Sequence, residues 1–177
     1  TDLGHKMIAD LICNLLDTEY SYYKKLGAEK KPSLPEPFTA SRYEDAQRFQ
    51  NYSCSPVMEG FEPDTHGAEQ WSNPFKGGWI AHKQGSCIKF NVSGSIIMLQ
   101  YRKTINKPAP VAYAVIDGDR QNKVLLDANF DEDWGDLCCL DEIYSGAKGE
   151  HTVEIVIDTE GKENSDFMLI SVITANK

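Results

Sequence analysis

The stretch IKFNVS, residues 88–93, alternates apolar and polar side chains along its whole length. The same period of two returns in four later runs, residues 97–102, 111–116, 152–157 and 168–172. Successive side chains of a β-strand point to opposite faces of the sheet, so this alternation predicts strands with at least one buried face. These runs, more than any other feature, decide the fold class.

Turn signals rich in glycine, proline and aspartate separate the runs: Ser93-Gly94, Lys107-Pro108, Asp117-Gly118-Asp119, Lys148-Gly149 and Glu160-Gly161. No helical stretch lies between consecutive strands, as a parallel βαβ arrangement would require. Short strands at this spacing are typical of an antiparallel sandwich. We therefore predict a mainly β chain, with an antiparallel β-sandwich of jelly-roll type over residues 38–177.

The first 26 residues have a different period and predict one amphipathic α-helix. Their apolar side chains recur at the spacing of one helix face: Leu3, Met7, Ile8, Leu11, Ile12, Leu15 and Leu16. A helix with so apolar a face is stabilised mainly by packing against something else. We expect this chain alone to leave the face incompletely covered.

Residues 27–37 read GAEKKPSLPEP and predict a proline-rich linker between the helix and the sandwich. The predicted organisation is thus a helix over 1–26, a linker over 27–37 and a sandwich domain over 38–177.

Composition narrows the classes of partner. The chain of 177 residues has 27 acidic and 18 basic side chains, a formal net charge of −9. A surplus of acid disfavours nucleic acid and anionic membranes as partners, and no apolar run approaches the roughly 20 residues of a membrane span. Five cysteines without a CxxC pair indicate structural thiols.

An acidic stretch over residues 127–142 holds seven carboxylates and no base. Oxygen side chains alternate at Asp127, Asn129, Asp131 and Asp133, which is a pattern suited to a hard cation, and they predict a candidate structural calcium site. The stretch departs from an EF-hand loop at Glu132 and Cys138. The alternative is a solvated acidic loop. We expect no other cofactor.

Two tryptophans in polar segments, Trp71 and Trp134, are candidates for a sugar-stacking platform, because aromatic faces pack on the apolar faces of sugars. Asp131 and Asp133 flank Trp134 and could accept hydrogen bonds from sugar hydroxyls. Trp79, beside Ile80 in an apolar run, is predicted to be core. A glycosidase built on acid and base groups among Glu59, Glu62, Asp64, His66 and Glu69 is a weaker alternative, since the sequence shows no pocket around them.

The opening residues TDLGHKMIADLI, 1–12, resemble the start of the last helix of SGNH (GDSL-type) ester hydrolases. Gly4, His5, Ile8 and Ala9 match that pattern, whereas Thr1 stands where the family has Asn. The resemblance implies that the catalytic Asp and His lie upstream of Thr1, so that the chain is a fragment or a processed chain. It implies no catalytic residue in this chain.

The remainder is similar, more loosely, to the β-sandwich domain appended to some SGNH-type hydrolases of anaerobic Gram-positive bacteria. The runs behind this similarity are residues 78–80, 85–90, 101–103, 114–119, 126–131 and 149–153. The resemblance implies a non-catalytic accessory domain of an esterase acting on acyl or acetyl esters, with an upstream hydrolase domain and carbohydrate as partners. The alternative is an autonomous carbohydrate-binding or adhesion module. An Asp-x-x-His-Pro block directly before Thr1 would distinguish them.

Overall fold

The computed structural model describes residues 2–26, 39, 41–65, 74–163 and 165–176. The chain divides into two compact units, Thr1–Ala40 and Ser41–Lys177, which are described separately. The predicted linker over 27–37 lies outside the described residues, as does Trp71.

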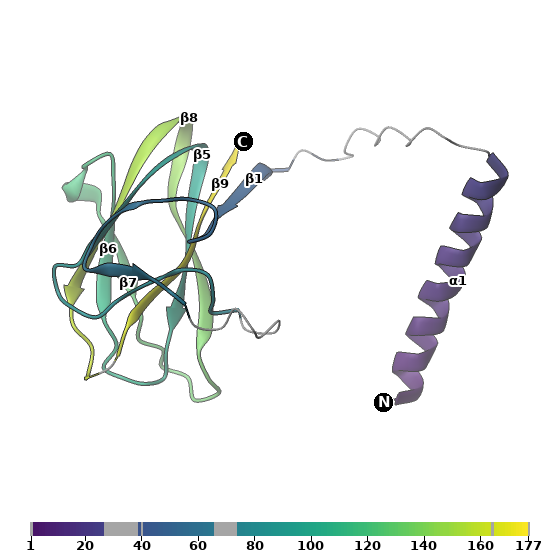
Figure 1. Ribbon diagram of the computed structural model, residues 1–177, viewed down its shortest axis with the longest axis horizontal. Coiled ribbons are helices and arrows are strands. Elements are labelled where there is room, and N and C mark those ends of the chain that lie inside the picture. Colours follow the sequence, from purple (N-terminus) through teal and green to yellow (C-terminus); the bar gives the residue numbers. More distant parts are fainter. Residues whose placement is uncertain (1, 27–38, 40, 66–73, 164, 177) are drawn as a thin grey trace. The chain divides into compact units, whose positions relative to one another are not determined.

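The first unit contains helix α1, Asp2–Leu26, as the apolar spacing predicts (Figure 1). Asp2 lies in its first turn and two lysines lie in its last, an arrangement that complements the helix dipole. Within this unit the seven side chains of the apolar face are exposed, from 53% at Ile12 to 70% at Leu3. No described helix has the length and apolar character needed to cross a membrane.

The second unit is built of antiparallel strands and one short 3₁₀-helix, η1 (Arg120–Asn122). The strands are β1 (Glu44–Phe49), β2 (Val57–Glu59), β3 (Phe61–Pro63), β4 (Trp79–Ala81), β5 (Cys87–Lys103), β6 (Val111–Ile116), β7 (Val124–Asp127), β8 (Leu137–Thr159) and β9 (Phe167–Asn176). The order is β3-β4-β9-β5-β8-β6-β7, while β1 also pairs with β9 and β2 with β5.

The two ends of this sheet pack face to face, which makes the antiparallel sandwich that the sequence predicts. One core cluster joins Trp79 of β4 and Phe167 of β9 to Ala112 of β6 and Leu126 of β7. Trp79 is 1% exposed and meets the ring of Phe90 edge-on, at 5.0 Å between centroids. The predictions of the fold class and of Trp79 as a core residue are therefore confirmed.

Strands β5 and β8 pass through both layers, and here two predicted turns are wrong. Ser93-Gly94 and Lys148-Gly149 are continuous strand, with Gly94 paired to Gly149. In β5 the core-facing positions change from even numbers (Ile88, Phe90) to odd numbers (Ile97, Leu99). The change falls where the register between β5 and β8 shifts, between Gly94 and Ile96.

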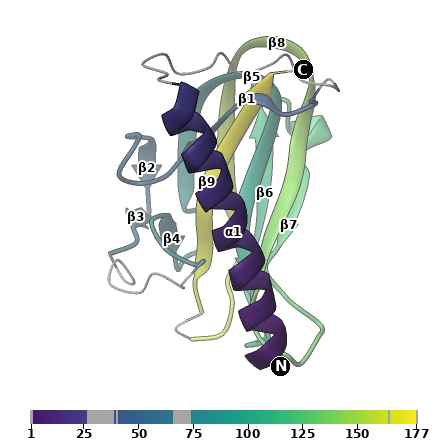
Figure 2. The same cartoon turned by 90° about the vertical axis from the view of Figure 1, so that its right-hand side faces the viewer.

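In the second half of β5, the side chains that do not face the main core form a second packed face. Figure 2 shows β9 with its neighbours β1 and β5. On the side away from the main core, Ile96 and Met98 form a small cluster with Ala175 of β9. The next residue on this outer face, Gln100, is polar and pairs with Ser171 of β9.

Candidate functional site

A groove of about 570 Å³ opens on this outer face, and strand register brings its residues together. Arg48 near the end of β1 pairs with Ile173 of β9, and Ile173 in turn pairs with Met98 of β5. Two residues further along β5, Gln100 lies between Ser171 of β9 and Leu140 of β8. The groove is lined in part by Arg48, Gln50, Tyr52, Asp64, Gln100 and Cys138.

A directed chain of hydrogen bonds runs along the bottom of the groove. Arg48 Nε donates to Ser171 Oγ at 3.1 Å, and Ser171 Oγ donates to Gln100 Oε1 at 2.8 Å. Ser171 is fully buried, so this relay holds the exposed Arg48 side chain at a defined place on the sheet. The remaining N–H groups of Arg48 and the amino group of Gln100 are left to donate elsewhere.

Two amide side chains connect the loops that form the rim. Gln50, 6% exposed, accepts from Tyr52 Oη at 2.6 Å and donates to the Lys76 carbonyl at 2.9 Å. Asn51 Nδ2 donates to the carbonyls of Asp64 and Gly78 at 2.9 and 2.8 Å. Because these bonds satisfy buried backbone carbonyls, they fix the rim relative to the strands.

Gly78 allows the rim to approach β9 closely. A Cβ atom at this position would lie 1.9 Å from the carbonyl oxygen of Leu169. Only a residue without a side chain fits such a contact.

Cys138, at the other side of the groove, is half-buried and is a free thiol. Burial raises the pKa of this thiol, so it stays protonated near neutral pH and presents a neutral, weakly polar surface. The described cysteines are all free thiols, in keeping with the structural role predicted for them.

Trp134 lies in the loop before β8 and is 64% exposed. The ring of Phe130 meets it edge-on at 5.0 Å between centroids, which holds the indole in place while leaving it open to solvent. Asp133, its neighbour, is also exposed. The geometry suits the stacking role predicted for Trp134, which stays a prediction.

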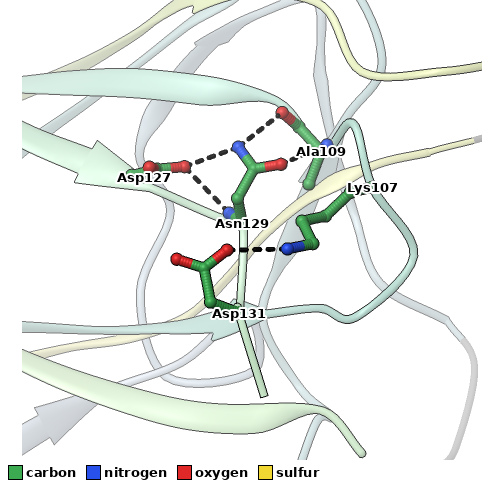
Figure 3. A network of polar contacts seen from close by, with 5 residues as sticks. All are labelled: Lys107, Ala109, Asp127, Asn129 and Asp131. Atoms are coloured by element: carbon green, nitrogen blue, oxygen red, sulfur yellow. Dashed lines mark hydrogen bonds and ion pairs between the residues drawn. The ribbon is translucent and has the colours of Figure 1, made fainter. Parts of the chain in front are cut away.

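Three of the four oxygen side chains proposed for calcium make contacts, and these are of two kinds (Figure 3). Asp127 Oδ1 accepts from the backbone N–H of Asn129 at 2.9 Å and from its Nδ2 at 2.6 Å. The side-chain oxygen of Asn129 accepts from the Ala109 N–H at 2.9 Å. These two residues therefore fasten the loop after β7 to the segment before β6.

Asp131 faces Lys107 instead, at 2.6 Å between Oδ1 and Nζ (Figure 3). This hydrogen bond and the positive charge of Lys107 hold the pKa of Asp131 below its usual value. Among the described residues, no three or more His, Cys, Asp or Glu side chains gather closely enough to hold a metal ion. Calcium at Asp127, Asn129, Asp131 and Asp133 stays a prediction.

Trp71 belongs to residues 66–73, outside the described part of the chain. These residues connect Thr65 to Pro74, both of which line the groove. The stacking role predicted for Trp71 stays a prediction.

The residues that sequence analysis missed are Arg48, Gln50 and Gln100. Gln100 occupies a polar position of a predicted strand, but no motif connects it to Arg48. Ser171 connects Gln100 and Arg48 through hydrogen bonds that span 71 and 123 residues of sequence. Only the register of three strands brings these residues together.

Proteins similar to this chain are found among solved structures. No protein-family model matches the chain, and no curated protein sequence matches it significantly. A solved two-domain esterase active on acetylated mannans, co-crystallised with mannopentaose, matches 99% of the chain with 39% identity and a TM-score of 0.78. The chain resembles part of a two-domain carbohydrate esterase. It spans 47% of that protein.

A second structure, also of a two-domain esterase active on acetylated mannans, matches 99% of the chain with 38% identity and a TM-score of 0.79. The chain spans 48% of it. A family two carbohydrate esterase from Cellvibrio japonicus matches 75% of the chain, and 34% of that protein is covered, with 13% identity and a TM-score of 0.54. At this identity the likeness concerns the fold alone.

Proposed function

We propose that this chain is the non-catalytic C-terminal part of an SGNH/GDSL-type esterase that removes acetyl groups from a polysaccharide. The β-sandwich would be its accessory domain and would hold the polysaccharide near the catalytic domain. The observation that carries the proposal is the similarity of 99% of the chain, helix included, to about half of an esterase active on acetylated mannans. Acetylated mannans are accordingly the first substrate to test.

Helix α1 would complete the catalytic domain. Its seven apolar side chains are exposed within the first unit, and burying each is worth roughly 1.5–3 kcal/mol. A partner that covers this face is therefore strongly favoured, and the α/β sheet of an upstream hydrolase domain is the partner we propose. Acyl transfer also needs a nucleophile, a base and oxyanion donors, which that domain would supply.

Carbohydrate binding by the sandwich would use Trp134 with Asp131 and Asp133, and Trp71 on the segment that joins two groove residues. The exposure of Trp134 and its support by Phe130 favour this use. An autonomous carbohydrate-binding or adhesion module remains the alternative. It would bind glycans equally well but would have no hydrolase domain beside it.

The test compares two proteins, the 177-residue chain and the longer chain encoded by its open reading frame. We expect p-nitrophenyl acetate and acetylated mannan to be hydrolysed by the longer chain only. The His5→Ala variant of the longer chain serves as a control that should fold and keep part of its activity, since His5 is not the proposed base. Turnover by the short chain, or no hydrolase domain upstream, would contradict the proposal.

A further inference from the structure

The bottom of the groove offers hydrogen-bond donors for which the described protein supplies no acceptor. Arg48 donates to Ser171 through Nε alone, and Gln100 accepts from Ser171 through Oε1. The outer N–H groups of the guanidinium and the Gln100 amino group are the donors that remain. Both residues line the groove, so a ligand there would meet these donors together.

Arg48 is also exceptional in its charge environment. The chain has four arginines, all among the described residues. The other three each have a carboxylate within ion-pair distance: Arg42 with Glu142, Arg102 with Asp136, and Arg120 with Glu154. Within the described part of the chain Arg48 has none, although acidic residues outnumber basic ones by 27 to 18.

The missing acceptor should be an acyl oxygen. A sugar hydroxyl both donates and accepts hydrogen bonds, so a pair of donors would leave the hydroxyl proton without an acceptor. A carbonyl oxygen has two lone pairs and no proton, and it can accept from Arg48 and Gln100 at once. The net charge of −9 opposes a polyanionic ligand, which favours the neutral carbonyl of an ester over a carboxylate.

We propose that Arg48 and Gln100 bind the carbonyl oxygen of an O-acetyl group on a neutral polysaccharide. Tyr52 and the neutral thiol of Cys138 line the same groove and offer surface to the acetyl methyl group. The sandwich thereby recognises the ester decoration itself, in addition to the sugar backbone. This inference rests on the proposed function and specifies the ligand of the accessory domain.

The test is calorimetric titration of the 177-residue chain with acetylated mannooligosaccharides and with the same preparation after mild alkaline deacetylation. We expect the acetylated form to bind about tenfold more tightly, as hydrogen bonds from a charged donor allow. A glucuronate-bearing xylooligosaccharide is the third probe and should bind no more tightly than the deacetylated mannooligosaccharides.

Two variants examine the donors. Gln100→Glu keeps the acceptor for Ser171 but removes the amino group and places a carboxylate beside Arg48, so the preference for acetylated ligand should disappear. Arg48→Gln should reduce the preference at least threefold. Arg120→Gln, which removes an arginine paired with Glu154 on another surface, should retain it. Melting curves of all three variants establish that they fold.

The outcomes of these titrations separate a failure of the inference from a failure of the proposed function. Equal binding of acetylated and deacetylated ligand overturns the inference while leaving the proposed function intact. Tighter binding of the glucuronate probe overturns it in favour of a carboxylate site. If none of the saccharides binds, the carbohydrate-binding part of the proposed function fails, and the inference fails with it. Retention of the preference by Gln100→Glu also overturns the inference.

Discussion

Arg48 donates a hydrogen bond to Ser171, a residue 123 positions later in the chain and fully buried in the neighbouring strand. The buried hydroxyl of Ser171 thus holds the exposed guanidinium of Arg48, and this hydroxyl donates its own hydrogen bond to Gln100. This pair places the bottom of the groove on the sheet, since neither residue belongs to a loop.

Replacing Ser171 by Ala should remove both hydrogen bonds of the relay. We expect the free energy of unfolding to fall by about 1–2 kcal/mol, because the Gln100 oxygen loses its donor in a partly buried place. Urea denaturation measures the change, with Ser93→Ala, an exposed serine of β5, as the control. A variant as stable as the native chain would mean that the relay contributes nothing to folding.

Gly78→Ala should be strongly destabilising. The added Cβ would lie 1.9 Å from the Leu169 carbonyl, and relief of this overlap requires a backbone shift in the rim or in β9. We expect a loss of about 2–3 kcal/mol, read as a lower midpoint of denaturation. Gly149→Ala is the matched change, since the nearest atom to its new Cβ is at 3.5 Å. Similar midpoints for the two variants would refute the proposed close approach.

Trp134→Ala should abolish the tryptophan fluorescence change that acetylated mannooligosaccharides produce. The indole is open to solvent on the side that Phe130 does not cover, which is the geometry that stacking on a sugar needs. Tyr43→Ala removes another exposed aromatic ring and should leave the titration unchanged. A fluorescence change that persists without Trp134 would place the sugar elsewhere.

Calcium is expected to leave the melting temperature unchanged. Asn129 already uses its oxygen on the Ala109 N–H, and Asp131 already pairs with Lys107, so a cation would have to break both contacts. Thermal melts in chelator and in millimolar calcium measure the effect, because a ligand of the folded state raises the melting temperature. A clear rise that Asp127→Ala removes would establish the predicted calcium site.

Acid should weaken the fold through Asp117. The hydrogen bond from His151, at 2.8 Å, and that from the Thr152 N–H lower the pKa of Asp117 below its usual 3.8. A carboxylate with a lowered pKa stabilises the folded state above the unfolded pKa, and this contribution is lost as pH falls through the folded pKa.

Unfolding experiments between pH 2 and pH 6 therefore should show a steeper loss of stability for the native chain than for Asp117→Asn. Asp158→Asn, an exposed carboxylate of β8, provides the control and should follow the native chain. Parallel curves for Asp117→Asn and the native chain would contradict the role given to Asp117.

The sequence by itself determined the fold class, because periodicity is local. Alternation with a period of two in β5, β6 and β9, and a period near 3.6 in α1, can be read without knowing what packs where. Burial of Trp79 followed from its place in an apolar run. The turns at Ser93-Gly94 and Lys148-Gly149 were wrongly predicted because a glycine marks a bulge within a strand as readily as a turn between strands.

Only the tertiary structure decided the groove. Arg48, Gln100 and Ser171 lie on three strands, and no local pattern says which strand pairs with which or in what register. A slip of one residue would turn Gln100 into the core and Tyr101 to the outside. The placement of the candidate site therefore depends on long-range pairing, which cannot be read from the residues one stretch at a time.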